Sequence, residues 1–272
     1  SGNIGATATS SGNVLIINAG SSVSAGSAVS IVASGIKNPG YVKTTTAYAL
    51  ETRDASNAAI DQGTATGNAI TAGAVTLGNA ALSNWTISNS TTVKISAKFA
   101  DSVPAGGFIK IGFPTGNTFV FGTVTANSPT IGLSGVTCTV ASNVVKIPVS
   151  AGYTPGAIAF TDLGLSGITN PSTIGDPGTW SITTTNSTAD GEAVIDQVSG
   201  IASDTITAGS ITSANVVLSG DLKAGGTPVI TISAAFADAV PAAGYIKIGF
   251  PTTNTFSFGA VTATSATIGL AG

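Results

Sequence analysis

The chain has 272 residues, of which 43% are hydrophobic and only 8% are charged, so it carries enough apolar side chains to bury a sizeable core. The sequence contains no His, which excludes catalytic triads of the Ser-His-Asp kind and zinc sites of the HExxH kind. The nine Lys and Arg residues are scattered singly among twelve Asp and Glu residues, a balance that argues against nucleic acid as a partner.

Residue usage predicts an all-β chain, because Val, Ile and Thr are frequent while the helix-favouring Glu, Lys, Gln and Arg are scarce. The clearest strand pattern is at 93–99, where Val93, Ile95, Ala97 and Phe99 alternate with polar residues and are expected to face inward. A turn around Pro104 follows. The next predicted strand buries Ile109, Ile111 and Phe113, and further short strands are expected at 118–124, 136–140, 143–148, 157–162 and 179–185.

The sequence is a tandem duplication. Residues 95–114 recur at 232–251 with differences at only four positions: Lys98/Ala235, Ser102/Ala239, Gly106/Ala243 and Phe108/Tyr245. The second copy predicts the same inward face, made of Ile230, Ile232, Ala234 and Phe236. Other segments repeat as well: 34–39 returns at 166–171, 60–62 at 195–197 and 70–73 at 206–209. A repeat of this length is about the size of a domain, so the chain is expected to contain two copies of one module.

Three segments carry a resemblance to a known class of fold. They are VPAGGFIKIGFP at 103–114, SGITNP at 166–171 and WSITTT at 180–185. Their order resembles the repeated immunoglobulin-like β-sandwich modules of secreted surface adhesins and extracellular appendage proteins. The resemblance implies an all-β fold of tandem immunoglobulin-like β-sandwich modules.

In this frame the complete module spans 67–203. Residues 1–66 are the second half of one module, and residues 204–272 are the first half of another. The last residues also run in phase into the first, since IGLAG followed by SGNIGATATSSGNV parallels IGLSGVTCTVASNV at 131–144. The sequence is thus expected either to be a repeating window of a longer array or to form subunits that complete one another by strand donation. The alternative phase divides it into two self-contained repeats, 1–135 and 136–272.

Candidate chemistry is sparse. Asp101 and Asp238 recur before the proline turn, and Asp61 and Asp196 recur in the IDQ segment, so these carboxylates are expected to cap turn amides. No cofactor is expected. A calcium ion held by Asp54, Asp61, Asp190, Glu192 or Asp196 is the alternative, without support from a DxDxDG loop. Cys138 aligns with Ala8 in the other copy and is expected to be a small buried strand residue.

Three segments fit the N-x-(S/T) pattern for N-glycosylation, at Asn84, Asn89 and Asn186. In so Thr-rich a chain the competing explanation is ordinary strand threonine. Aromatic residues likewise have two interpretations, a sugar-binding face or the core, and we expect the core. The residues concerned are Trp85, Trp180, Tyr48 and the pairs Phe119/Phe121 and Phe256/Phe258.

These features predict a structural protein that is not an enzyme. We expect a subunit of an extracellular filament, pilus-like fibre or cell-surface array, which binds other copies of itself head to tail and carries glycans. No run of 18 apolar residues occurs, so no membrane span is expected. The alternative function is the stalk of an adhesin or a module that binds carbohydrate or another cell. An accessory domain of a polysaccharide hydrolase fits less well, because the two copies contain no evident carboxylate pair.

Overall fold

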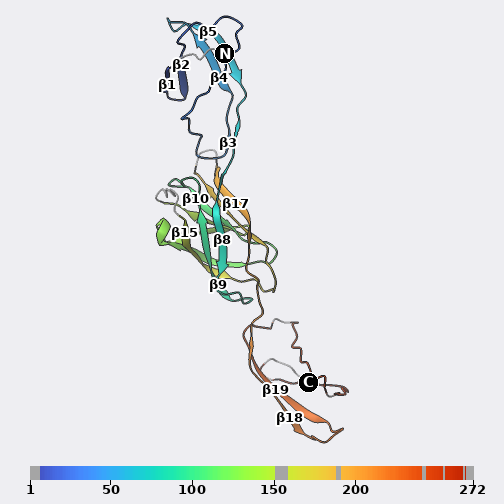
Figure 1. Cartoon of the computed structure of the whole chain (residues 1–272). Helices are drawn as coiled ribbons and strands as arrows, with labels where there is room; N and C mark the ends of the chain where they lie inside the picture. Colours follow the sequence, from blue (N-terminus) through green and yellow to red (C-terminus); the bar gives the residue numbers. More distant parts are fainter. Residues whose placement is uncertain are drawn as a thin grey trace. The chain divides into compact units, whose positions relative to one another are not determined.

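A computed structural model of the chain describes residues 7–150, 159–187, 191–240, 243–253, 255–265 and 267. The fold is all-β, and the one helical segment in the described residues is the short 3-10 turn Pro129–Ile131. The chain divides into two units, Ser1–Ile70 and Thr71–Gly272 (Figure 1).

The larger unit contains two sheets that share one core. The six-stranded sheet has the order β13 (Thr139–Ala141), β14 (Val144–Pro148), β10 (Phe108–Gly112), β16 (Thr179–Thr185), β17 (Val194–Ala202) and β7 (Gly73–Ala74). The five-stranded sheet has the order β12 (Leu133–Thr137), β11 (Val120–Ser128), β15 (Phe160–Thr169), β9 (Ser90–Lys98) and β8 (Thr76–Leu82). The named pairings are antiparallel except that of β17 with β7, which is parallel. We call residues 71–207 the closed region.

The core of the closed region consists of alternate residues from the strands of both sheets. Val93, Ile95 and Ala97 on β9 are fully buried, which confirms the predicted inward face of this strand. Ile109 and Ile111 on β10 are buried from the other sheet, as predicted. The closed region therefore follows the alternation of its sequence, with a period of two residues.

Aromatic side chains fill one part of this core. The ring of Phe113 lies 4.4 Å from that of Trp180 and 5.3 Å from that of Phe119, measured between centroids. Phe121 completes the group, 4.9 Å from Phe113 in an edge-to-face arrangement. The prediction that Trp180, Phe119 and Phe121 belong to the core is confirmed. The same prediction is wrong for the aromatic residues that no second sheet covers: Trp85 is 52% exposed, Tyr48 49%, Phe256 37% and Phe258 60%.

The two halves of the closed region exchange their central strands. Residues 71–137 supply four strands of the five-stranded sheet, but its middle strand β15 comes from the second half and lies between β11 and β9. Conversely, β10 comes from the first half and lies between β14 and β16 of the second. Neither half can therefore complete its sheet alone.

The described residues of the smaller unit form three short two-stranded ladders. They pair β1 (Thr7–Ser11) with β2 (Val14–Asn18), β3 (Lys43–Thr44) with β6 (Ala69–Ile70), and β4 (Tyr48–Arg53) with β5 (Ala59–Ala65). The strands are exposed along nearly all of their length. The β1–β2 and β4–β5 ladders form because their strands are adjacent in the sequence, whereas β3 and β6 pair at the two ends of the segment that contains β4 and β5.

After the closed region the chain forms one long hairpin, β18 (Ile211–Gly220) with β19 (Pro228–Phe236). The expected inward face of this second copy is not buried, since Ile232 is 41% exposed and Phe236 is 39% exposed. The reason is that no second sheet covers it in this part of the described chain. Figure 1 shows this hairpin near the C-terminal end of the trace.

Other strand predictions are met with shifted bounds. The strand expected at 179–185 has those bounds, while the one expected at 118–124 runs from Val120 to Ser128. The segment expected at 136–140 is divided at Cys138 between β12 and β13. The strand expected from 157 is described from Phe160 onward, and its first residues lie outside the described part.

Candidate functional site

Both ends of the described chain repeat the sequence of parts of the closed region, but neither end forms two sheets around a buried core. Residues 34–53 correspond to 166–185, so the N-terminal unit repeats the second half of the closed region. Residues 232–265 correspond to 95–128, so the C-terminal part repeats the first half. We call residues 7–70 the N-terminal open half, and the described part of 208–265 the C-terminal open half.

The C-terminal open half exposes side chains that the closed region buries. Ile246 and Ile248 are 41% and 47% exposed, whereas their counterparts Ile109 and Ile111 are 1% and 0% exposed. Residues 244–250 also form no strand, although they repeat β10 almost letter for letter. In the closed region the neighbours of β10 are β14 and β16, which both come from the second half. Their absence from this half explains the difference.

The N-terminal open half shows the complementary defect. Residues 28–37 correspond to β15 but form no strand, and Ile31 and Ile36 are 60% and 69% exposed. Their counterparts Leu163 and Ile168 are 0% and 2% exposed. The two ladder partners of β15 are β9 and β11, which belong to the first half. The N-terminal open half therefore lacks the counterparts of β9 and β11, which belong to the C-terminal open half.

An aromatic cluster is partly assembled in the C-terminal open half. The rings of Phe250 and Phe256 are 5.2 Å apart and those of Phe250 and Phe258 are 4.9 Å apart, close to the spacings around Phe113. Phe258 is nevertheless 60% exposed. The counterpart of Trp180 is Tyr48 of the N-terminal open half, which is 49% exposed. The counterpart of the fourth ring therefore belongs to the N-terminal open half of the sequence.

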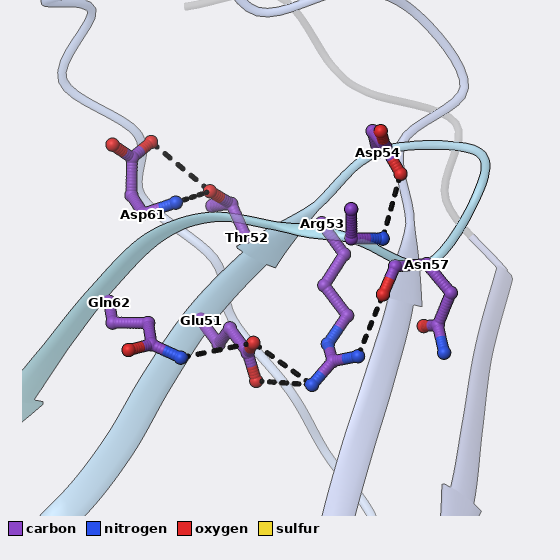
Figure 2. Close-up of polar contacts among 8 residues, drawn as sticks. Glu51, Thr52, Arg53, Asp54, Asn57, Asp61 and Gln62 are labelled. Atoms are coloured by element: carbon purple, nitrogen blue, oxygen red, sulfur yellow. Dashed lines mark hydrogen bonds and ion pairs between the residues drawn. The ribbon is translucent and has the colours of Figure 1, made fainter.

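The hairpin β4–β5 carries a polar network on one face (Figure 2). Arg53 forms an ion pair with Glu51 at 2.9 Å and donates a hydrogen bond to the carbonyl oxygen of Asn57 at 2.9 Å. The Gln62 amide donates to Glu51 at 3.3 Å. The hydrogen bonds from Arg53 and Gln62 lower the pKa of the Glu51 carboxyl, so Glu51 is negatively charged near neutral pH.

Two carboxylates converge on Gly73 inside the closed region. Asp196 is fully buried, and its Oδ2 accepts a hydrogen bond from the backbone N–H of Asp101 at 3.1 Å. A Cβ built on Gly73 would clash with Asp196 Oδ1 and would lie 3.0 Å from Asp101 Oδ2. Asp196 Oδ1 has no hydrogen-bond partner among the described residues. Burial raises the pKa of Asp196, and the negative charge of Asp101 raises it further.

The expectation that recurrent aspartates cap turn amides holds for Asp196, which binds the N–H of Asp101. Two of the others have different partners: Asp61 accepts from the Thr52 hydroxyl at 3.1 Å across the β4–β5 ladder, and Asp238 accepts from the side-chain amide of Asn89 at 3.3 Å. Asp54 caps its own turn by accepting from the N–H groups of Ser56 and Ala58. These carboxylates therefore accept hydrogen bonds from neighbouring residues of the chain and stabilise its turns and ladders.

The calcium alternative gains no support from the arrangement of these side chains. Among the described residues, no three Asp, Glu, Cys or His gather into a group that could hold a metal ion. Asp190 lies outside the described residues. Glu192 forms ion pairs with Lys110 and Lys146, and these lower its pKa. Cys138 is 8% exposed and free, in agreement with the prediction of a small buried residue.

The three glycosylation candidates lie in different environments. Asn84 is half-buried and closes a turn by accepting from the N–H of Thr86 at 2.9 Å. Asn89 is also half-buried and donates to Asp238 at 3.3 Å. Asn186 is only 5% exposed and its Oδ1 accepts from the N–H of Ala193, so a glycan there would require this residue to turn outward. Attachment at any of the three stays a prediction.

Sequence reasoning missed the charged pairs on the outer face of the six-stranded sheet. Lys110 and Lys146 are direct cross-strand partners on β10 and β14, and Glu192 binds both. The ammonium nitrogen of Lys146 lies 3.7 Å from the centre of the Phe108 ring, a cation–π contact. The sequence contained a sign of these pairs. Charged residues are rare in it, and Lys110 and Lys146 occupy outward positions of two predicted strands.

Comparisons with protein-family models, with curated proteins and with solved structures found no match for this chain. The described residues also contain no helix with the length and apolar character needed to cross a membrane.

Proposed function

We propose that the protein is a structural subunit of an extracellular filament or surface array, built from immunoglobulin-like β-sandwich modules. Copies join head to tail, and the C-terminal open half of one copy completes the N-terminal open half of the next. Neighbouring copies are either separate chains or consecutive parts of one longer chain. The proposal includes no catalytic activity.

One observation carries this proposal: each open half lacks the central strand that the other open half contains. Residues 244–250 correspond to β10. The two neighbours of β10 are β14 and β16, and their counterparts in the N-terminal open half are β2 and β4. Residues 28–37 correspond to β15, and the two neighbours of β15 correspond to β19 and to residues 257–265. The exchange of β10 and β15 completes both sheets of the closed region, and the same exchange between two copies would complete both sheets at each junction.

The physical drive for joining is the burial of apolar side chains and of open ladder edges. Exposed apolar patches and unpaired strand edges both favour association. The side chains concerned include Ile31, Ile36, Ile246, Ile248 and Phe258, each at least 41% exposed. Each contact uses two different surfaces, one from each end of the chain. A contact of this kind that does not close into a ring propagates into a linear polymer.

An extracellular location agrees with the composition. The chain has a mean hydropathy of +0.44 with few charges, so unassembled copies would expose much apolar surface to water. Assembly covers this surface, and glycans on outward residues would add solvation. Stability would come from packing, since a single Cys allows no internal disulfide.

Electron microscopy and sedimentation velocity of the purified 272-residue chain at rising concentration test the proposal. We expect filaments one module wide and a sedimentation coefficient that increases with concentration. Ile248→Asp should abolish assembly, because it places a charge at a position that the junction buries. Ile174→Asp is the matched control, since Ile174 is 62% exposed in a loop of the closed region. Dispersed wild-type monomers, or filaments formed by Ile248→Asp, would contradict the proposal.

A further inference from the structure

We propose that Lys247 of one copy forms an ion pair with Glu51 of the next copy, and that Tyr245 of the first copy receives Arg53 of the second. This inference rests on the proposed function and names the contact that selects the partner. The binding site is the polar face of the β4–β5 hairpin (Figure 2), and its ligand is the segment 244–250 of a second copy.

The register of the closed region places these residues opposite one another. On β10, Lys110 is the direct cross-strand partner of Thr183 on β16 and of Lys146 on β14. The repeat matches Lys110 with Lys247, Thr183 with Glu51 and Lys146 with Ile16. At the junction, Lys247 therefore lies between Glu51 on one side and Ile16 on the other. Directly opposed side chains have Cβ atoms about 4.5–5.5 Å apart, within reach of an ion pair.

The charges differ between the two sites in a compensating way. In the closed region two lysines lie side by side, and Glu192 neutralises them from a neighbouring loop. At the junction the second lysine is replaced by Ile16, and an acid appears on the facing strand as Glu51. Glu51 then faces Lys247 across the ladder and Arg53 on its own strand, so one acid again serves two bases, as Glu192 does in the closed region. This pattern gives charge complementarity between two ends of the chain that are far apart in sequence.

Tyr245, two residues before Lys247 on the same face, shows a similar change of partner. Phe108 is the cross-strand partner of Thr185, and its ring receives the ammonium group of Lys146 from β14. The repeat matches Phe108 with Tyr245 and Thr185 with Arg53. Because Lys146 has become Ile16, the cation that covers the ring at the junction would come from β4 instead. Tyr245 is 84% exposed in the C-terminal open half, so its ring is accessible to Arg53.

The ion pair would fix register and orientation rather than supply most of the affinity. Ion pairs at a solvent-exposed rim contribute little to affinity, but like charges brought together there disfavour a partner. A shift of 244–250 by one residue would turn Lys247 into the apolar core. The pair therefore distinguishes the correct register from the slipped one.

Zero-length carbodiimide cross-linking of filaments tests the contact without any substitution. Filaments are assembled from equal amounts of unlabelled and 15N-labelled chains, and cross-linked peptides are identified by mass spectrometry. The ion pairs of Glu192 with Lys110 and Lys146 serve as internal positive controls. We expect a Glu51–Lys247 cross-link that joins labelled with unlabelled peptides. Filaments that form, with the Glu192 cross-links present but the Glu51–Lys247 cross-link missing, would overturn this inference and leave the proposed function intact. A Glu51–Lys247 cross-link found only within single chains would overturn both.

Charge reversal tests the same pair by its effect on assembly. We expect Glu51→Lys and Lys247→Glu each to raise the concentration needed for assembly roughly tenfold, because each places like charges opposite one another. The double variant should return to within about threefold of the wild type. Lys223→Glu, in the exposed turn of the β18–β19 hairpin, is the control for the change in net charge that Lys247→Glu causes. Absence of rescue in the double variant would contradict the ion pair.

Discussion

The closed region and the C-terminal open half contain the same segment, IKIGFP, in two different states. In the closed region Ile109 and Ile111 are buried in a strand between two neighbours, whereas Ile246 and Ile248 are exposed in a segment that forms no strand. The local sequence is the same, so propensity cannot explain the difference. The partner strands decide it, and in the closed region they are β14 and β16 from its second half.

The hairpins confirm this explanation from the opposite direction. β18–β19 and β4–β5 form in the open halves because both strands of each pair lie close together in sequence. Residues 28–37 and 244–250 depend on strands that are distant in sequence, and they form no ladder. The open halves therefore retain local pairing and lack the pairing that would join two sheets into one core.

The largest expected effect comes from matched truncations of one core position. Ile111→Ala should lower the free energy of unfolding of the closed region by about 2–5 kcal/mol, because it leaves a cavity in a fully buried site. Ile248→Ala should change this transition by less than about 0.5 kcal/mol in unassembled chains. Urea unfolding followed by Trp180 fluorescence measures both. Equal losses for the two variants would refute the contrast between the regions.

A second matched pair concerns two glycines with the same backbone angle. Gly167 and its counterpart Gly35 both have φ of 79°. A Cβ on Gly167 would clash with the Thr123 carbonyl oxygen, while one on Gly35 would meet nothing within 4 Å. We expect Gly167→Ala to destabilise the closed region by about 2–3 kcal/mol and Gly35→Ala to leave it unchanged. Calorimetry of the two variants distinguishes these outcomes, and a stable Gly167→Ala protein would show that the Thr123 contact is not restrictive.

The buried carboxylate of Asp196 predicts a pH dependence. Because burial raises its pKa in the folded state, Asp196 favours the folded state most at pH values below the pKa of the unfolded chain, about 3.9. This contribution is lost as the pH rises through the folded pKa. The variant Asp196→Asn should remove it, so the stability difference between Asp196→Asn and the wild type should grow in favour of the variant from acidic to neutral pH. Thermal melts at several pH values measure this difference, and a constant difference would exclude the titration of Asp196.

The smallest expected effect concerns thiol reactivity. Burial raises the pKa of Cys138 to about 11, so the thiol of the folded chain should react slowly with iodoacetamide at pH 8. The matched control is Ala8→Cys in a Cys138→Ala background, because Ala8 is the exposed counterpart of Cys138. We expect rapid labelling of that variant and slow labelling of the wild type. Equal rates would mean that the Cys138 site opens as readily as the open half.

Much of the closed region could be predicted from the sequence. Alternation placed Val93, Ile95 and Ala97 in the core, and the duplication indicated that both ends repeat parts of the middle. The same alternation predicted that Ile232 and Phe236 of the second copy face a core, but the structure exposes them. A pattern of apolar residues identifies the face that should be buried, but it does not say whether a covering sheet is present.

The charged residues of the candidate junction could not be assigned from the sequence alone. Their meaning depends on register, and the pairing of Lys110 with both Lys146 and Thr183 is known only from the ladder. Once that register is applied to the repeat, Glu51 and Lys247 become partners. The strand exchange between the halves is likewise a property of topology, which local patterns do not determine.

Amide hydrogen exchange of residues 28–37 and 244–250, measured before and after assembly, tests the account most directly. The account predicts rapid exchange of both segments in isolated chains and strong protection of both in filaments, at rates approaching those of β15 and β10. Protection that is already present in isolated chains, or rapid exchange that persists in filaments, would contradict it.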